Sequence, residues 1–164
     1  MRVLIVDDDR AFSIILTAKL KAWKPEAMPV FAASIAQAKK QLAECEQFQL
    51  AFIDQHLPDG DGTSLYTNTS LANALIVGVS ADEAPELNVV NVEAGARIFL
   101  QKMQVTGPLF VPLMDAILKR ELLQNELVEL KLRETKLKST KTILSTLFHE
   151  INNPLGAILG CTYL

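Results

Sequence analysis

Several features that mark common protein classes are scarce in this 164-residue sequence. The two cysteines, Cys45 and Cys161, lie far apart without metal-site spacing, which favours a reduced, cytoplasmic protein. No apolar run approaches the roughly 20 residues that a membrane helix needs, so we expect a soluble chain without membrane contact. The net charge of −3 does not favour binding to nucleic acid, and we expect no nucleic-acid partner. Met1-Arg2 leads at once into a short apolar run ended by acids, so we expect no signal peptide.

Short apolar runs alternate with helical patterns along the first hundred residues. The runs cover residues 3–6, 28–31, 50–53, 74–79 and 96–100. Apolar runs without polar alternation are typical of strands that are covered on both faces, as in a parallel sheet. Between the runs we expect helices after Asp9, which is the predicted N-cap, after Ser34, after Gly62 and from Ala81. This order predicts an α/β fold, a five-stranded, doubly wound parallel sandwich.

Four of the predicted strands end in side chains that can carry chemistry. These residues are Asp7 with Asp8, Asp54, Ser80 and Lys102. Taken singly, an acid or a serine after a strand is more often a helix cap, and a lysine there is usually solvated. In a doubly wound sheet, however, the carboxyl ends of the strands meet at one crevice. Three carboxylates close together repel one another unless a cation is present, and hard carboxylate oxygens suit Mg²⁺.

Such a cluster predicts phosphoryl chemistry. A metal-bound carboxylate such as Asp54 can attack phosphorus and become an acyl phosphate. Lys102 can offset the charge of the added group, and Ser80 can donate a hydrogen bond to one of its oxygens. His56 is close by in sequence, but we interpret it as a solvated loop histidine. A metal-dependent phosphohydrolase is the minor alternative, because it would use the same acidic crevice.

Residues 1–120 resemble the receiver domain of bacterial two-component response regulators. The resemblance rests on the acids and lysine above together with Pro58, Gly62, Ala81 and Phe99. It implies a flavodoxin-like receiver fold in which Asp54 is the phosphoacceptor and Lys102 is the phosphate partner. It also implies an Mg²⁺ site made by Asp7, Asp8, Asp54 and a backbone carbonyl near Gln55 or His56. Ser80 would be the hydroxyl switch and Phe99 the aromatic that changes rotamer with it, although Phe99 fits a plain core aromatic equally well.

One residue departs from the family's pattern. The family usually has a proline after the lysine, joined by a cis peptide bond, whereas Met103 follows Lys102 here. A cis bond before a residue other than proline costs roughly 2.5–4 kcal/mol. We therefore predict a trans Lys102–Met103 peptide and a shifted loop, which puts the reach of Lys102 in question.

Residues 113–148 contain neither glycine nor proline. Apolar side chains recur there at alternating steps of three and four, as in the seam of a coiled coil. The seam residues are Leu123, Leu127, Leu130, Leu137, Leu144, Phe148 and Ile151. Glu134 and Lys141 occupy the same seam and should weaken it or change its register. We expect a dimeric coiled coil; the alternative is one long helix folded back on the first domain.

Residues 139–164 resemble the start of the phosphoacceptor helix of histidine kinases. The match is the motif His149-Glu-x-x-Asn-Pro-Leu155. The resemblance implies that His149 is phosphorylated, that Glu150 accepts its proton, and that Asn153 positions water. It also implies a homodimer that exchanges phosphoryl groups with histidine or aspartate partner proteins. We find no glycine-rich nucleotide loop, so we interpret the chain as the N-terminal part of a hybrid histidine kinase. The rival interpretation is a non-catalytic interaction module whose dimerisation is controlled by phosphorylation.

Overall fold

The computed structural model describes residues 1–44, 47–81 and 98–160, and the side chains of residue 145 and residues 148–160 lie outside this description. The chain divides into two compact units, Met1–Met114 and Asp115–Leu164. Among the described helices, none has both the length and the apolar character that crossing a membrane requires.

The first unit is built on a five-stranded parallel sheet in the order β2-β1-β3-β6-β7. The strands are β1 (Arg2–Val6), β2 (Met28–Ala32), β3 (Leu50–Asp54), β6 (Leu75–Ser80) and β7 (Ile98–Gln101). A small antiparallel pair, β4 (His56–Leu57) and β5 (Gly60–Asp61), follows β3. Each apolar run predicted as a strand therefore contributes one strand to the sheet, and the predicted fold class is confirmed.

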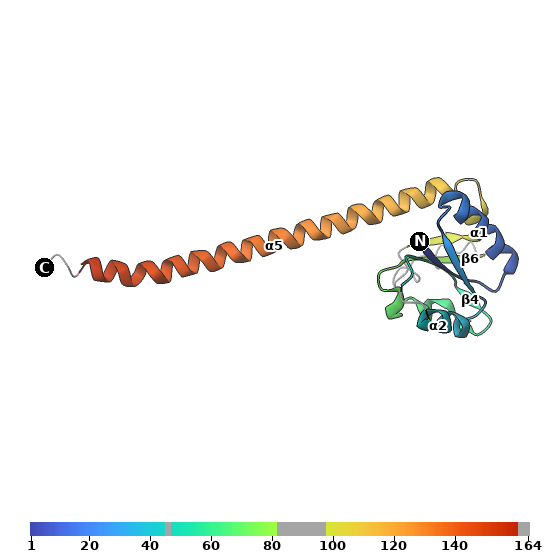
Figure 1. Ribbon diagram of the computed structural model, residues 1–164, viewed down its shortest axis with the longest axis horizontal. Helices are drawn as coiled ribbons and strands as arrows, with labels where there is room; N and C mark the ends of the chain where they lie inside the picture. The colour runs from blue at the N-terminus through green and yellow to red at the C-terminus, as the bar shows by residue number, and fades with distance from the viewer. Residues whose placement is uncertain (45–46, 82–97, 161–164) are drawn as a thin grey trace. The chain divides into compact units, whose positions relative to one another are not determined.

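Helices cover both faces of this sheet. In the described part of the chain the helical elements are α1 (Arg10–Trp23), α2 (Ile35–Glu44), η1 (Gly62–Leu65), η2 (Thr69–Leu71), α4 (Lys102–Thr106) and α5 (Phe110–Gly160). Neighbouring residues of a strand point to opposite faces. Ile53 thus joins the cluster formed with α2, whereas Phe52 packs against Phe110 at the start of α5. Figure 1 shows the strands between α1 and α2.

Local hydrogen bonds explain where the first two helices begin. The side chain of Asp9 accepts hydrogen bonds from the backbone N–H groups of Ala11 and Phe12, so the predicted N-cap of α1 is confirmed. At the start of α2, Ser34 Oγ accepts from the N–H of Gln37, and Gln37 Oε1 accepts from the N–H of Ala33. The first bond is an N-cap, and the second satisfies the N–H of the residue that precedes the cap.

The prediction of a helix after Gly62 is wrong. The structure has two short 3₁₀ turns there, η1 and η2. Asp61 and Asn68 cap them by accepting from the N–H groups of Thr63 and Ser70. Polar side chains that bond to the nearby backbone compete with a regular helix, and this segment is rich in such residues. The helix expected from Ala81 falls on residues 82–97, outside the described residues.

Candidate functional site

The three predicted acids meet at the carboxyl edge of the sheet. Asp7 follows the last residue of β1, and Asp54 is the last residue of β3, the strand paired beside it. One carboxylate oxygen from each of Asp7, Asp8 and Asp54 lies within 4.8 Å of the others. Asp7 and Asp54 are buried, while Asp8 is exposed. The parallel register of neighbouring strands thus brings acids 46 and 47 residues apart in sequence into one cluster.

Lys102 reaches into the same cluster from the first residue of α4. Its Nζ lies 2.7 Å from Asp54 Oδ2 and donates a hydrogen bond of 2.9 Å to Asp7 Oδ1. A capping box between Gln101 and Gln104 fixes the start of α4. No cis peptide bond occurs among the described residues, so the trans Lys102–Met103 peptide is confirmed. Met103 therefore does not keep the lysine from the acids.

Burial and charge act in opposite directions on these groups. Burial raises the pKa of Asp7 to about 6, and the charge of Asp54 adds to the rise, although hydrogen bonds from Lys102 and Asp9 oppose it. For Lys102, burial acts to lower the pKa, but the hydrogen bonds to Asp54 and Asp7 outweigh it, and the pKa is raised above its ordinary value. The lysine therefore stays charged, whereas burial makes the ionised form of Asp7 costly.

The donor set of this cluster fits a hard divalent cation. Asp7 Oδ2 is buried, and although Lys102 Nζ lies 2.8 Å away, no hydrogen bond of acceptable geometry reaches this oxygen. A buried carboxylate oxygen without a hydrogen bond is a position that a cation can satisfy. The carbonyl of Gln55 accepts a hydrogen bond from the N–H of Gly62 at 2.9 Å, and the backbone carbonyl expected near Gln55 or His56 as a further ligand stays a prediction.

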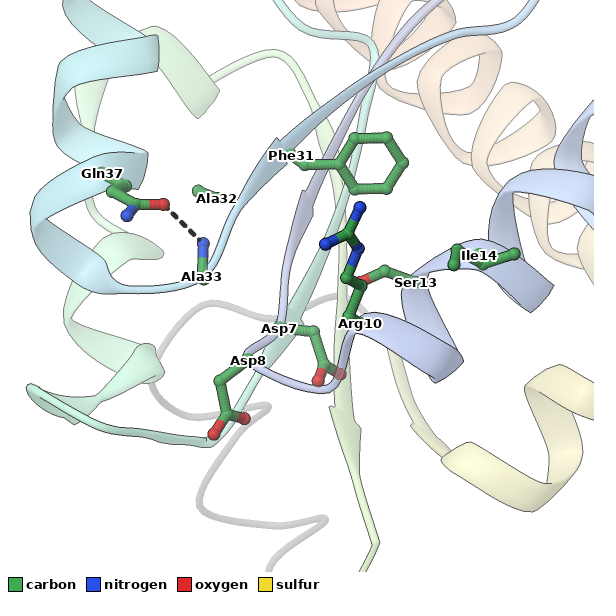
Figure 2. A pocket seen from close by; sticks show the side chains of 9 residues that line it. All are labelled: Asp7, Asp8, Arg10, Ser13, Ile14, Phe31, Ala32, Ala33 and Gln37. Atoms are coloured by element: carbon green, nitrogen blue, oxygen red, sulfur yellow. Dashed lines mark hydrogen bonds between the residues drawn. The ribbon is translucent and has the colours of Figure 1, made fainter.

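A cavity of about 520 Å³ opens beside the acids. Figure 2 shows Asp7 and Asp8 at one end of it, with Arg10 and Phe31 further along. The cavity lies between the first turn of α1 and the loop from β2 to α2. A group that approaches the cluster from this side therefore meets the exposed carboxylate of Asp8.

Ser80 and Phe99 belong to the next two strands. Ser80 is the last residue of β6, fully buried, and it pairs in register with Gln101 of β7. Since Asp54 lies opposite Val79 in the neighbouring pair, Ser80 is placed at the same edge of the sheet as the acids. Phe99 lies opposite Gly78 and is half-buried. That position is compatible with both roles considered for Phe99, so its function stays a prediction.

Three residues near the site were not recognised for their local roles from the sequence. Asp59 accepts from the N–H groups of Ile35 and Ala36 and so holds the start of α2 from a distant loop. A Cβ atom on Gly62 would overlap the carbonyl oxygen of Asp54, so only glycine fits there. Phe12 lies beside the ammonium group of Lys102. Helical spacing alone does not reveal this contact, because it joins residues in distant parts of the chain.

The second predicted motif lies in the second unit. His149, Glu150 and Asn153 are within α5, which continues past Pro154 to Gly160. Their side chains lie outside the described residues, so their roles stay predictions.

Comparisons with known proteins agree with this architecture. The family model of the response regulator receiver domain matches residues 3–110. A receiver domain protein (CheY-like) from Methanospirillum hungatei JF-1 superposes with a TM-score of 0.59 at 28% identity, covering 76% of this chain and 95% of that one. The signal receiver domain of a DNA-binding response regulator from Colwellia psychrerythraea 34H gives 0.62 at 21% identity, covering 74% and 98%, and supports the fold alone.

One curated relative is a much longer protein. The sensory/regulatory protein RpfC of Xanthomonas campestris pv. campestris is 30% identical over 129 residues, which are 74% of this chain but 17% of that protein. Fold, site and family model together define a receiver domain of two-component signalling. The chain belongs to the response regulator receiver domain family.

Proposed function

We propose that Asp54 accepts a phosphoryl group from a phosphohistidine and thereby acts as the switch of a two-component phosphorelay. The observation that supports this most strongly is the placement of Lys102 Nζ, 2.7 Å from Asp54 Oδ2 within a cluster of three carboxylates. An isolated buried lysine–aspartate pair would need no further acids. The additional carboxylates of Asp7 and Asp8 suit a site that handles a cation and a phosphoryl group together.

The residues of this chain have separate tasks in that transfer. An oxygen of Asp54 forms a bond to phosphorus as the bond from phosphorus to the donor's imidazole nitrogen breaks, and the nitrogen keeps the electron pair. Lys102 neutralises charge on the transferred group, and Ser80 is the candidate hydroxyl donor to it. Asp7, Asp8 and Asp54 would hold Mg²⁺, which supplies charge neutralisation when it is bound.

Phosphorylation with a small acyl phosphate tests this proposal. We expect acetyl phosphate and Mg²⁺ to add one phosphoryl group to the protein, detected by intact-protein mass spectrometry, and Asp54→Asn to abolish the addition. Asp61→Asn is the matched control, because it changes an exposed acid of the same loop while asparagine can still cap η1. Equal phosphorylation of the Asp54→Asn variant would contradict the proposal.

We also propose that the chain is the N-terminal part of a hybrid histidine kinase, with the receiver domain at 1–120, a signalling helix at 113–148 and the start of the phosphoacceptor helix at 139–164. Support comes from the His149-Glu-x-x-Asn motif and from its position on α5. In this role His149 carries the phosphoryl group, Glu150 accepts its proton and Asn153 positions water. With labelled ATP and the full-length protein, His149→Gln should abolish incorporation. If the variant incorporated as much label as the unchanged protein, the alternative interpretation, a non-catalytic interaction module, would be favoured.

A second copy of this chain is the proposed partner of α5. The seam leucines that the structure describes are all at least half exposed: Leu123, Leu127, Leu130, Leu137 and Leu144. A single helix cannot bury such a stripe, whereas two copies pack it as a coiled coil.

Because α5 begins in the first unit and continues through the second, phosphorylation of Asp54 would act on the helix pair through its start. Beryllofluoride, a phosphoryl mimic, should then change the distances between spin labels on the two α5 helices. If it changed neither these distances nor the kinase output of the full-length protein, the proposed coupling would be contradicted.

A further inference from the structure

Phe12 of α1 carries a feature that the predicted chemistry does not use. The ammonium nitrogen of Lys102 lies over its ring, 4.9 Å from the centroid. We propose that Phe12 is a positioning residue whose aromatic face holds the Lys102 ammonium group in place between Asp7 and Asp54. The inference rests on the proposed function of Lys102 in the phosphorylation of Asp54, and it assigns that function a further residue.

The geometry fits a cation–π interaction. Such interactions are favourable within about 6 Å of the ring centroid and become stronger when water is excluded. Phe12 is 4% exposed, and the side chain of Lys102 is 18% exposed, so both partners are largely shielded. An ammonium group has three donors and no acceptor. The two carboxylates and the ring face together surround it with groups that attract positive charge.

Both partners are held by their helices. The N–H of Phe12 donates to Asp9 Oδ1 at 3.1 Å, and the N–H of Asp9 donates to Asp7 Oδ1 at 2.8 Å. The ring is therefore tied, through one short segment, to an acid of the cluster itself. At the other end of α4, Lys19 Nζ of α1 donates to the carbonyl of Gly107 at 2.7 Å. These contacts hold the first turn of α1 beside the acids and α4 against α1, which brings the ring and the lysine close together.

The ring has a property that the carboxylates lack. A cation bound by Asp7 and Asp54, or a phosphoryl group on Asp54, changes the charge with which these acids attract Lys102. The long lysine side chain is flexible and would follow such a change. The aromatic face neither titrates nor reacts, so its attraction for the ammonium group persists through the transfer. Phe12 thus keeps Lys102 within reach of Asp54 while the charges around it change.

Fluorination of the ring separates this role from simple packing. Phenylalanine with one, two or three ring fluorines keeps nearly the same shape but has a progressively weaker negative face. With the series at position 12, we expect the rate of phosphorylation by acetyl phosphate to fall stepwise, by roughly 2- to 10-fold in total. The matched control is the same series at Phe48, a buried phenylalanine in another part of the core, which should give no trend.

A second measurement needs no phosphoryl chemistry. In metal-free protein, the free energy of unfolding should fall stepwise as fluorines are added to the ring of Phe12. The same series in a Lys102→Met background should show no trend. A flat series with Lys102 present, or the same trend with Lys102→Met, would overturn the proposal. If the Lys102-dependent trend in stability appears but Asp54 is not phosphorylated, the positioning contact stands and the proposed function fails instead.

Discussion

The two units of the chain treat their apolar side chains in opposite ways. In Met1–Met114, leucines such as Leu4, Leu16 and Leu65 are fully buried. In α5 beyond Asp115, Leu127 and Leu137 are 52% and 71% exposed. Burying a leucine side chain stabilises the folded state by roughly 1.5–3 kcal/mol. The first unit obtains this stabilisation from contacts within one chain. The exposed leucines of α5 can gain it only from another surface.

Charged residues differ between the units in the same way. Lys102 is shared by two largely buried acids, whereas the pairs of α5 are exposed and join residues one helical turn apart. Exposed pairs of this kind contribute about 0.3–0.5 kcal/mol. The first unit thus contains a largely buried cluster of opposite charges, whereas the described ion pairs of α5 are exposed and lie along one helix.

The largest expected effect comes from removing the aromatic anchor at the start of α5. Phe110 is fully buried, and its ring lies 6.3 Å from that of Phe52 and 6.5 Å from that of Trp23. Phe110→Ala should lower the free energy of unfolding by about 3–5 kcal/mol, because it leaves a cavity in the core. Denaturant titration followed by the fluorescence of Trp23 measures this. Leu109→Ala, at a neighbouring residue that is 71% exposed, should change it by less than about 0.5 kcal/mol.

Removing one cation from each unit tests the electrostatic half of the comparison. Lys102→Met leaves two buried acids without their partner. Breaking a fully buried pair lowers the free energy of unfolding by about 3–5 kcal/mol. Because Lys102 is partly exposed, we expect a loss of about 2–3 kcal/mol here. Lys138→Met removes the exposed partner of Glu134 and should cost less than about 0.5 kcal/mol. Urea unfolding in metal-free buffer distinguishes the two, and equal losses would mean that the buried cluster is not tightly coupled.

Completing the seam of α5 should strengthen association between copies. Glu134→Leu together with Lys141→Leu adds apolar surface to the seam, and we expect dimer affinity to rise by at least about tenfold, since about 1.4 kcal/mol suffices for that factor. Sedimentation equilibrium gives the Kd. The control is Glu129→Leu with Lys136→Leu, which adds the same side chains off the seam. If the control gains as much affinity, non-specific hydrophobic association rather than a coiled-coil seam explains the gain.

The smallest expected effect concerns threonines on α5. Thr140 Oγ1 donates to the carbonyl of Lys136, one turn earlier in the same helix, and the residue is exposed. Thr140→Ala should leave stability unchanged or raise it by a few tenths of a kcal/mol, because alanine is the better helix former. Thermal melting followed by circular dichroism checks this. A loss above about 1 kcal/mol would indicate that Thr140 is buried against a partner.

Much of the first unit could be predicted from the sequence because its signals are local. Continuous apolar runs marked the strands, and an acid or a lysine at the end of a run marked the site. The two 3₁₀ turns after Gly62 could not be predicted, because the capping hydrogen bonds of Asp61 and Asn68 compete with helix formation there. Nor could the capping of α2 by Asp59, which joins residues more than twenty positions apart.

The sequence by itself determined the chemical groups of the site: three acids, a hydroxyl and a lysine, each at the end of a strand. The tertiary structure alone decided how they meet. Parallel pairing places the carboxyl ends of β1 and β3 side by side, and the packing of α1 against α4 sets Phe12 beneath Lys102. Contacts of this kind depend on strand register and helix packing, which no local pattern of residues encodes.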